Sequence, residues 1–265
     1  MGERAVPAFK QPFDGAGNKN NSRNNSTTKM TKEVEVSIVL QTYNEAKNIG
    51  TLIQRINSSV FQSKEIIVID DDSPDKTWEI VEQLNHENVR VLRLLKGRNL
   101  VGAIQKGIDE AKGKYVIWMD ADLSMPPEVI PKMVENLEKY DIVTGSRYVR
   151  GGKDKRPFIR VASSRIINIV ANMILNFKVL DYDTGFVAAR KKVLENLRLP
   201  PSIHGEYCIE LLYKAGRKGY RIKEIPYSFT DRKAGESKTA ETLFALWKMG
   251  IVYIKRIIRA RFSEN

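Results

Sequence analysis

The sequence predicts an α/β fold with a mostly parallel central sheet and helices on both of its faces. Short apolar runs rich in β-branched residues alternate with segments whose apolar residues recur every three or four positions. Between residues 34 and 144 these patterns follow one another in the order of repeated β-α-β units. The chain has 265 residues, 42% of them hydrophobic, which is enough to bury the core of one such domain.

Each predicted strand is a short apolar run bounded by polar residues or turn signals. The predicted strands are 36–40, 65–69, 89–94, 115–119, 141–144, 187–190 and 220–229. Pro226 lies inside the last of these, which places that strand at a sheet edge. The segments between strands each carry one apolar helical face, as in Ile49, Leu52, Ile53 and Ile56. The predicted helices cover 49–56, 78–84, 103–108, 129–137, 157–177, 206–217 and 240–262.

Composition sets outer limits on class and partners. Residues 1–32 include an Asn/Ser/Lys tract with little to bury, and we predict that this tail is disordered. The single cysteine, Cys208, excludes an intrachain disulfide. The net charge of +12 suggests a polyanionic partner such as nucleic acid, an anionic membrane or a phosphorylated substrate. No uncharged apolar run reaches about 18 residues, so no membrane-spanning helix is expected, nor does the N-terminus show the apolar core of a signal peptide.

Two aspartates directly follow the apolar strand 115–119. Asp120 and Asp122 are two residues apart, so on an extended chain both carboxylates point the same way, beyond the end of the strand. Open α/β sheets bind ligands at that edge. Two converging carboxylates repel each other unless a cation lies between them, and oxygen ligands favour Mg²⁺ or Mn²⁺. The alternative is that Asp122 caps the helix near Pro126 or Pro127 and Asp120 is a solvated strand end.

Two further strands end in polar clusters, at 42–45 and at 70–75. The edge therefore suits a polar ligand, yet neither a Gly-x-Gly-x-x-Gly fingerprint nor a Gly-x-x-x-x-Gly-Lys-Ser/Thr loop is present. An anionic nucleotide would need a bridging metal in such an acidic cleft. Alternatively, Asp72 or Ser73 simply caps the helix that begins near Thr77.

A basic segment leads directly into an apolar helix. Its cations are Arg147, Arg150, Lys153, Lys155, Arg156, Arg160 and Arg165. A solvated loop is the alternative, but the apolar helix that follows suits an acceptor with a phosphate head and a hydrocarbon tail. Nucleic acid would need more stacking aromatics than Tyr148 and Phe158, and we expect none to bind. The two histidines, His86 and His204, are weak candidates for a general base; a phosphate acceptor needs none because it is already anionic.

Five motifs occur in the order found in the dolichyl-phosphate mannose synthases, which are inverting GT-A glycosyltransferases of the family 2 type. They are Thr-Tyr-Asn-Glu (42–45), Asp-Asp-Asp-Ser-Pro-Asp (70–75), Asp-Ala-Asp-Leu-Ser (120–124), Gly-Ser-Arg-Tyr (145–148) and Arg-Lys-Ala-Gly-Glu-Ser-Lys (232–238). The chain resembles this family from about residue 34 to 240. The resemblance implies a GT-A fold and transfer of mannose from GDP-mannose to the phosphate of a polyprenol.

The resemblance also implies roles for particular residues. The nucleoside would be held by Thr42, Tyr43, Glu45 and Asp71. Asp120 and Asp122 would bind the metal, Mg²⁺ or Mn²⁺, and the donor diphosphate. The acceptor phosphate would be received by Arg147, Arg160 and Ser164, so that Asp122 and Arg147 act in catalysis. A loop closing over the donor would carry Arg232, Ser237 and Lys238.

The chain departs from the family pattern at two positions. Gln41 stands where a proline usually opens the first motif, a change that we do not expect to alter the chemistry. Ser124 stands where some members have a glutamine that completes the metal shell, and water could fill that place. Asp183, in a segment resembling the family's Asp-x-x-Ser/Thr-Gly-Phe motif, could be catalytic, but we favour a turn or cap that shapes the site. Glu210 lies among apolar neighbours, and we expect it to pair with a basic loop.

The last helix combines a basic face with an apolar one. Its predicted apolar stripe is Phe244, Trp247, Ile251, Ile254 and Ile258, with cations at Lys248, Lys255, Arg256 and Arg259. We expect a helix that lies in the membrane interface, on the cytoplasmic face of the cell membrane or endoplasmic reticulum. The alternatives are a helix packed on the domain, or a groove for a small membrane-embedded partner subunit.

The expected organisation is a disordered tail (1–32), a GT-A catalytic domain (33–238) and a membrane or partner helix (239–265). Three other functions stay open. The same reaction could use another donor, such as UDP-glucose. The chain could also be a metal-dependent phosphohydrolase with Asp120 as its nucleophile. In such an enzyme, however, we would expect this motif after an early strand and not after the fourth. Intact Asp120, Asp122 and Arg147 argue against a non-catalytic binding subunit.

Overall fold

A computed structural model describes residues 33–95, 99–202, 205–231 and 243–262, and the side chains of these except 243–247. The predicted tail, residues 1–32, lies outside this part. The strands are β1 (Val36–Thr42), β2 (Lys64–Asp70), β3 (Val89–Arg93), β4 (Tyr115–Asp120), β5 (Ile142–Ser146), β6 (Lys153–Asp154), β7 (Val187–Arg190), β8 (Ile222–Pro226) and β9 (Ser228–Phe229). The helices are α1 (Ile49–Ser59), α2 (Thr77–Gln83), α3 (Leu100–Glu110), the 3₁₀ turn η1 (Pro127–Val129), α4 (Ile130–Asn136), α5 (Phe158–Leu175), α6 (Lys191–Asn196), α7 (Tyr207–Arg217) and α8 (Leu243–Phe262).

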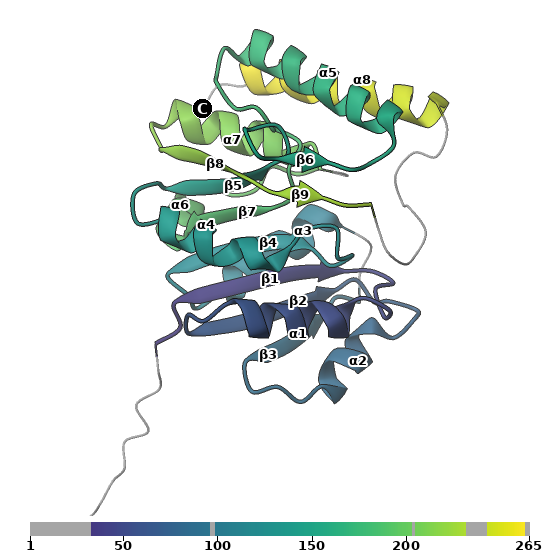
Figure 1. The fold of residues 1–265 in the computed structure, drawn as a ribbon, viewed down its shortest axis with the longest axis vertical. Helices are drawn as coiled ribbons and strands as arrows, with labels where there is room; N and C mark the ends of the chain where they lie inside the picture. The colour runs from purple at the N-terminus through teal and green to yellow at the C-terminus, as the bar shows by residue number, and fades with distance from the viewer. Residues whose placement is uncertain (1–32, 96–98, 203–204, 232–242, 263–265) are drawn as a thin grey trace, which may run out of the picture. The chain divides into compact units, whose positions relative to one another are not determined.

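Seven strands form the central sheet in the order β3-β2-β1-β4-β7-β5-β8, with helices on both faces (Figure 1). Most neighbouring strands are parallel, as predicted, but β7 runs antiparallel to both β4 and β5. A reversed strand begins at the edge where its neighbours end. The segment that precedes β7 therefore arrives beside the carboxyl ends of β4 and β5, and it brings residues 181–186 to the aspartates after β4.

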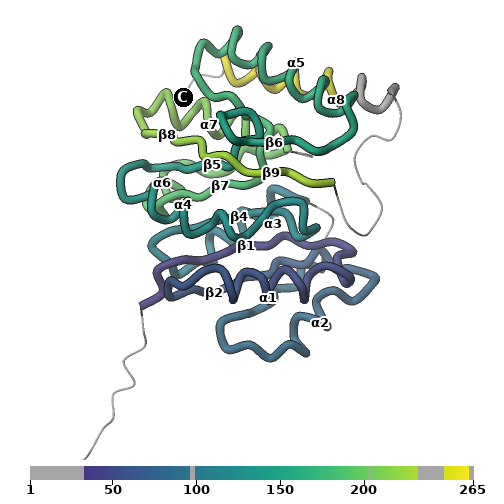
Figure 2. Tube along the Cα trace, viewed as in Figure 1, coloured from purple at the N-terminus to yellow at the C-terminus, as the bar shows by residue number. Residues whose placement is uncertain are grey.

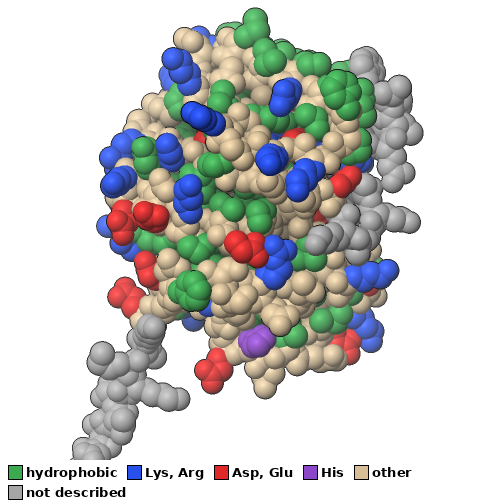
Figure 3. Space-filling view, in the orientation of Figure 1, with side chains coloured by type: hydrophobic (Ala, Val, Ile, Leu, Met, Phe, Trp, Pro, Cys, Tyr) green, Lys and Arg blue, Asp and Glu red, His purple; other side chains and the backbone are tan. Residues whose placement is uncertain are grey.

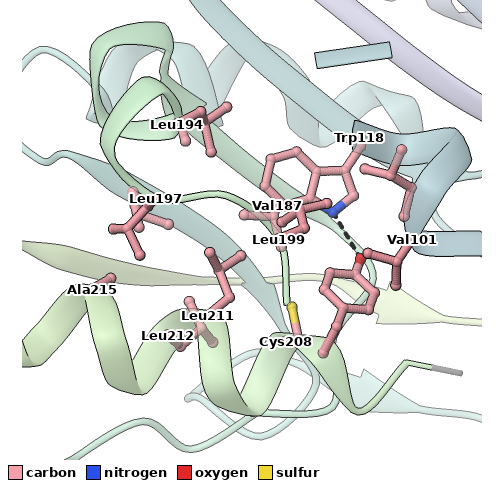
Figure 4. Packing of buried hydrophobic residues seen from close by; sticks show 14 of the residues in the cluster. Val101, Trp118, Val187, Leu194, Leu197, Leu199, Cys208, Leu211, Leu212 and Ala215 are labelled. Carbon is pink, nitrogen blue, oxygen red and sulfur yellow. Dashed lines mark hydrogen bonds between the residues drawn. The ribbon is translucent and has the colours of Figure 1, made fainter. Parts of the chain in front are cut away.

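The two faces of the sheet carry separate hydrophobic cores because side chains alternate along each strand. Leu40 and Met119 face one core, under α1 and α4, whereas Val39 and Trp118 face the other, under α3 and α7. In the second core the Trp118 indole N–H donates a 2.9 Å hydrogen bond to the Tyr207 hydroxyl (Figure 4). This bond gives the buried Trp118 N–H its partner, and it fixes the start of α7 under the centre of the sheet.

The predicted strand 220–229 is wrong as a single element. The structure divides it into β8, which pairs with β5, and β9, which pairs with β6 in a separate two-stranded sheet. Pro226 ends β8, and because proline has no N–H it cannot continue the ladder. Tyr227 then turns inward and meets the Phe186 ring edge-on, at 5.8 Å between ring centres. The predicted edge position is confirmed, since β8 is the last strand of the sheet. The short elements β6 and α6 were not predicted.

Helices α5 and α8 lie side by side at one end of the sheet, where both trace views show them together (Figure 1, Figure 2). One side of α5 packs on the domain through Ser164, Asn168, Ala171 and Leu175. The opposite side exposes large apolar residues, namely Phe158, Ile159, Ile166, Ile169 and Met173. In the space-filling view, hydrophobic side chains lie among Lys and Arg side chains in the upper part of the molecule (Figure 3).

By length and composition α5 is long and apolar enough to cross a membrane, which corrects our expectation that no helix is. The expectation was based on the absence of an uncharged apolar run. Helix α5 has a mean hydropathy high enough for a membrane span although it carries Arg160 and Arg165. The core helix of a soluble protein can pass the same test, so this finding alone does not place α5 in a bilayer.

Helix α8 packs against α5 and α7, with Tyr253, Ile257 and Ala260 buried. The predicted apolar stripe is rotated from this buried face, because Ile254 and Ile258 are exposed. Arg256, predicted on the basic face, instead turns inward. There it lies 3.8 Å from Glu206 and 2.7 Å from Glu210.

Candidate active site

The two aspartates after β4 lie at the edge of the sheet, in a turn that lines a cavity of about 640 Å³. Asp120 ends the strand, and its Oδ1 accepts a 2.8 Å hydrogen bond from the side-chain amide of Gln41 on the neighbouring strand β1. Asp122 is buried and accepts the backbone N–H of Ser124 at 3.0 Å. This bond forms a tight turn rather than the helix cap considered above. A Cβ at Gly185 would lie 3.6 Å from both carboxylate oxygens of Asp120, so glycine keeps space open beside them.

Gln41 therefore has a structural role that sequence reasoning missed. Its amide nitrogen orients Asp120, while its Oε1 is buried without a hydrogen-bond partner in the described part of the chain. The neighbouring register of β1 and β4 creates this contact, and no local sequence pattern reports it.

The predicted nucleoside residues Thr42, Tyr43, Glu45 and Asp71 line the same cavity. Thr42, at the end of β1, donates to the buried Asp70 at 2.7 Å. Glu45 accepts the side-chain amide of Asn48 at 2.8 Å. The first bond joins the end of β1 to the end of β2, and the second lies within the turn 45–48 that leads into α1.

The aspartate run 70–75 divides into structural and cavity-lining members. Asp70 also accepts the backbone N–H of Ser73 at 2.8 Å, which closes the loop. The N-cap position of α2 is Lys76, not Asp72 or Ser73, and Asp75 just before it accepts the Thr77 N–H at 3.1 Å. Of the six residues in this run, Asp71 is the one that lines the cavity.

Arg147 lines the same cavity and is buried against an acid that sequence reasoning did not single out. Its Nε and Nη2 donate to the two oxygens of Asp181 at 2.8 and 2.6 Å, and Nη2 also donates to the Asp183 carbonyl at 2.7 Å. Burial would lower the pKa of Arg147, but the charges of Asp181 and Asp183 outweigh it and hold that pKa well above its ordinary value. A buried arginine requires such a counter-charge, and this requirement is the only signal that could have pointed to Asp181.

The predicted acceptor residues Arg160 and Ser164 project from α5 into the same cavity. The Ser164 hydroxyl donates to Asp183 Oδ2 at 3.3 Å and accepts from Arg147 Nη2 at 3.4 Å. Arg160 lies 3.9 Å from Asp231, a long and partly exposed pair. Of the remaining basic cluster, Arg156 lines the cavity and binds Asp154, whereas Arg150, Lys153, Lys155 and Arg165 are exposed.

Asp183 lines the cavity between these groups. Its carboxylate accepts hydrogen bonds from Ser164 and, at 2.7 Å, from the hydroxyl of Tyr253 on α8, contacts that the expected turn or cap did not include. The C-terminal helix thus contributes a side chain to the cavity, which the sequence did not indicate.

Asp120 and Asp122 fit a divalent cation as far as the protein's own ligands go. No group of three or more Asp, Glu, His or Cys that could hold a metal occurs among the described residues. Mg²⁺ typically takes one or two carboxylates and completes its shell with substrate phosphates and water. The buried Ser124 hydroxyl also lacks a hydrogen-bond partner within the described ranges, which leaves a polar group for a further ligand at this turn.

A salt bridge between Arg256 and Glu210 joins helix α8 to α7. Glu210 accepts from Lys214 and from Arg256, both at 2.7 Å, which confirms that Glu210 is paired but replaces the expected basic loop with two helical partners. Burial would raise the pKa of Glu210, but these two hydrogen bonds outweigh it and lower the pKa. His86 is exposed in the turn after α2, as expected. His204 and the predicted donor-loop residues Arg232, Ser237 and Lys238 lie outside the described residues.

Comparison with known proteins agrees with this arrangement. A solved structure of glucosyl-3-phosphoglycerate synthase from Mycobacterium tuberculosis, in complex with Mn²⁺, UDP-glucose and phosphoglyceric acid, superposes with a TM-score of 0.68 at 20% identity. It covers 88% of this chain and 81% of its own. The same enzyme in complex with Mg²⁺ and UDP gives a TM-score of 0.67. These neighbours are GT-A glycosyltransferases, so the predicted fold class is confirmed.

Two relatives are each called dolichol-phosphate mannosyltransferase. The one from Saccharomyces cerevisiae is 36% identical over 248 residues, which are 88% of this chain and 90% of the relative. The one from Pyrococcus furiosus is 40% identical over 219 residues; the match covers 80% of this chain and 61% of the relative's length. The profile of the family described as "Glycosyl transferase family 2" matches residues 37–198. The chain therefore belongs to glycosyl transferase family 2.

Proposed function

We propose that the chain transfers mannose from GDP-mannose to the phosphate of a polyprenol such as dolichyl phosphate, with inversion at the sugar carbon. The names of its relatives support this proposal. One structural observation carries it: Asp120 and Asp122 line the same cavity as Arg147, Arg160 and Ser164. A leaving diphosphate and an attacking phosphate can therefore be held within one enclosure.

The donor occupies the acidic side of the cavity. Thr42, Tyr43, Glu45 and Asp71 contact the nucleoside, and Asp120 faces the diphosphate. Asp120 and Asp122 would hold Mg²⁺ or Mn²⁺, which would supply positive charge beside the leaving diphosphate. Both ions occur with glycosyltransferases of this fold.

The acceptor phosphate occupies the basic side. It is already anionic near neutral pH, so attack on the sugar needs alignment rather than removal of a proton. Arg160 and the Ser164 hydroxyl supply donors. Arg147 uses Nε and Nη2 on Asp181 and Asp183, and we assign to the phosphate its Nη1, which lies 3.8 Å from Asp154.

A lipid acceptor implies a membrane surface, and α5 supports that partner. Its exposed apolar side begins at Phe158, close in sequence to Arg160 in the cavity, and continues to Met173. Laid on the cytoplasmic face of a membrane, this side would receive the hydrocarbon chain while Arg160 receives the phosphate. The double variant Phe158→Ser with Met173→Ser should reduce flotation with anionic vesicles. Unchanged flotation would favour a small membrane-embedded partner subunit as the cover of α5.

The decisive experiment gives the purified protein GDP-mannose or UDP-glucose, polyprenyl phosphate, and Mg²⁺ or Mn²⁺. We expect a mannosylated lipid, and its near absence with Asp122→Asn. Faster transfer from UDP-glucose would replace the donor in this proposal. Release of inorganic phosphate without lipid would indicate a phosphohydrolase, and an inert protein would contradict transferase function altogether.

A further inference from the structure

Tyr253 reaches the cavity from the C-terminal helix. It lies well beyond residues 37–198, the part matched by the family profile. Its side chain is buried under α5 and α7, and its hydroxyl lies 2.7 Å from Asp183 Oδ1. Both residues line the cavity together with Gly205, where an added Cβ would lie 3.4 Å from the tyrosine oxygen. The hydroxyl is thus closely packed, and it ends at the wall that holds the acceptor residues.

Asp183 is held from three separate elements. Arg147, after β5, donates to its backbone carbonyl, Ser164 on α5 donates to Oδ2, and Tyr253 on α8 donates to Oδ1. Arg147 Nη2 is also 3.5 Å from Oδ2. The orientation of this one carboxylate therefore determines how strongly it engages Ser164 and Arg147, two of the groups that we assign to the acceptor phosphate.

We infer that Tyr253 is a positioning residue for the acceptor phosphate, which it serves by fixing the Asp183 carboxylate. This inference rests on the proposed transfer to a polyprenyl phosphate. With its Oδ1 bound by Tyr253, Asp183 meets Ser164 and Arg147 through Oδ2 alone. Without the tyrosine hydroxyl, Oδ1 loses its donor, and the carboxylate is free to turn both oxygens towards Arg147 and Ser164. It then competes with the incoming phosphate for the same donors.

The protonation of Tyr253 agrees with a permanent donor role. Burial raises the pKa of the Tyr253 hydroxyl well above its ordinary value, and the charge of Asp183 raises it further. The hydroxyl therefore keeps its proton near neutral pH and acts as a donor to Asp183.

The test compares Tyr253→Phe with Tyr213→Phe. Tyr213 also buries its ring, at the contact between α7 and α8, and its hydroxyl accepts from Arg261 at 3.1 Å, but it does not line the cavity. Each variant thus loses one hydroxyl on the same pair of helices. We expect Tyr253→Phe to raise the KM for polyprenyl phosphate about tenfold, the loss typical of a hydrogen bond to a charged group, and to leave the KM for GDP-mannose unchanged. Tyr213→Phe should change neither.

A second pair of variants tests the route through Asp183. In an Asp183→Asn background, Tyr253→Phe should raise the acceptor KM much less, because the group that it positions is already altered. The same increase in both backgrounds would overturn the inference. So would equal effects of Tyr253→Phe on donor and acceptor KM, or an effect of Tyr213→Phe as large as that of Tyr253→Phe.

Binding of a short-chain prenyl monophosphate, measured by calorimetry without any sugar donor, separates this inference from the proposed function. If the unmodified protein neither binds this ligand nor transfers sugar, the proposed function fails. If it binds, and Tyr253→Phe binds equally well, the inference alone fails. Weaker binding by Tyr253→Phe and unchanged binding by Tyr213→Phe would support it.

Discussion

Asp181 supplies the main counter-charge of the buried Arg147, so Asp181→Asn tests how the acceptor wall is held together. The two side chains form a two-pronged pair, with Nη2 2.6 Å from Oδ1, and their exposed fractions are only 3% and 0%. Breaking a buried pair by removing one charge typically costs about 3–5 kcal/mol, because the remaining charge is left without compensation. Asp154 and Asp183 stay 3.8 and 3.5 Å from Arg147. They retain part of the compensation, so we expect Asp181→Asn to lower the free energy of unfolding by about 3 kcal/mol.

Arg198 and Asp109 provide the matched control. Their nitrogen and oxygen are 2.8 Å apart, almost the same distance, but the side chains are 69% and 48% exposed. Exposed pairs contribute about 0.2–1 kcal/mol. Urea unfolding of Asp181→Asn and Asp109→Asn, followed by circular dichroism, should therefore separate the two by about 2 kcal/mol or more. Equal losses would refute the reasoning, because they would mean that burial adds nothing to the Arg147 pair.

Three other predictions concern the metal, Gln41 and α8. Chelation with EDTA should abolish sugar transfer, and added Mn²⁺ should restore it in the unmodified protein but not in Asp122→Asn; full activity in EDTA would contradict a metal role. Gln41→Leu removes the amide that orients Asp120, and it should weaken Mn²⁺ binding about tenfold. An electron-spin-resonance titration of free Mn²⁺ measures this affinity, and an unchanged affinity would mean that Gln41 does not orient the metal ligand. Arg256→Met should lower the free energy of unfolding at pH 7. Because the pKa of Glu210 is lowered in the folded state, its pairing stabilises the protein above the ordinary glutamate pKa. This stabilisation is lost as the pH falls through the lowered value, so the difference from the unmodified protein should narrow in acid; a gap that widens in acid would be evidence against the pairing.

The sequence predicted the large strands and the acids that follow them because these signals are local. A run such as 115–119 reports its own burial, and Asp120 and Asp122 mark its end without reference to any other segment. The helical face of α1 was predicted for the same reason, and all four of its expected core residues are buried.

Partners that meet through tertiary packing could not be predicted in this way. Asp181 and Arg147 are 34 residues apart, and Gln41 and Asp120 are 79 apart, so only the finished sheet brings them together. The packing of α8 depends on tertiary contacts in the same way. The apolar stripe predicted from its spacing includes Ile254 and Ile258, which are exposed, but no local pattern indicates that Arg256 pairs with Glu206 and Glu210.

The reversed direction of β7 limits how this enzyme could be re-engineered. The segment 181–186 is joined to a strand that is hydrogen-bonded on both sides, between β4 and β5, and its Asp181, Tyr182 and Phe186 are fully buried. Replacing this segment with that of a homologue would therefore disturb the centre of the sheet as well as the cavity. Libraries aimed at new lipid acceptors have a safer target in the solvent-facing positions of α5, where variation leaves the interior intact.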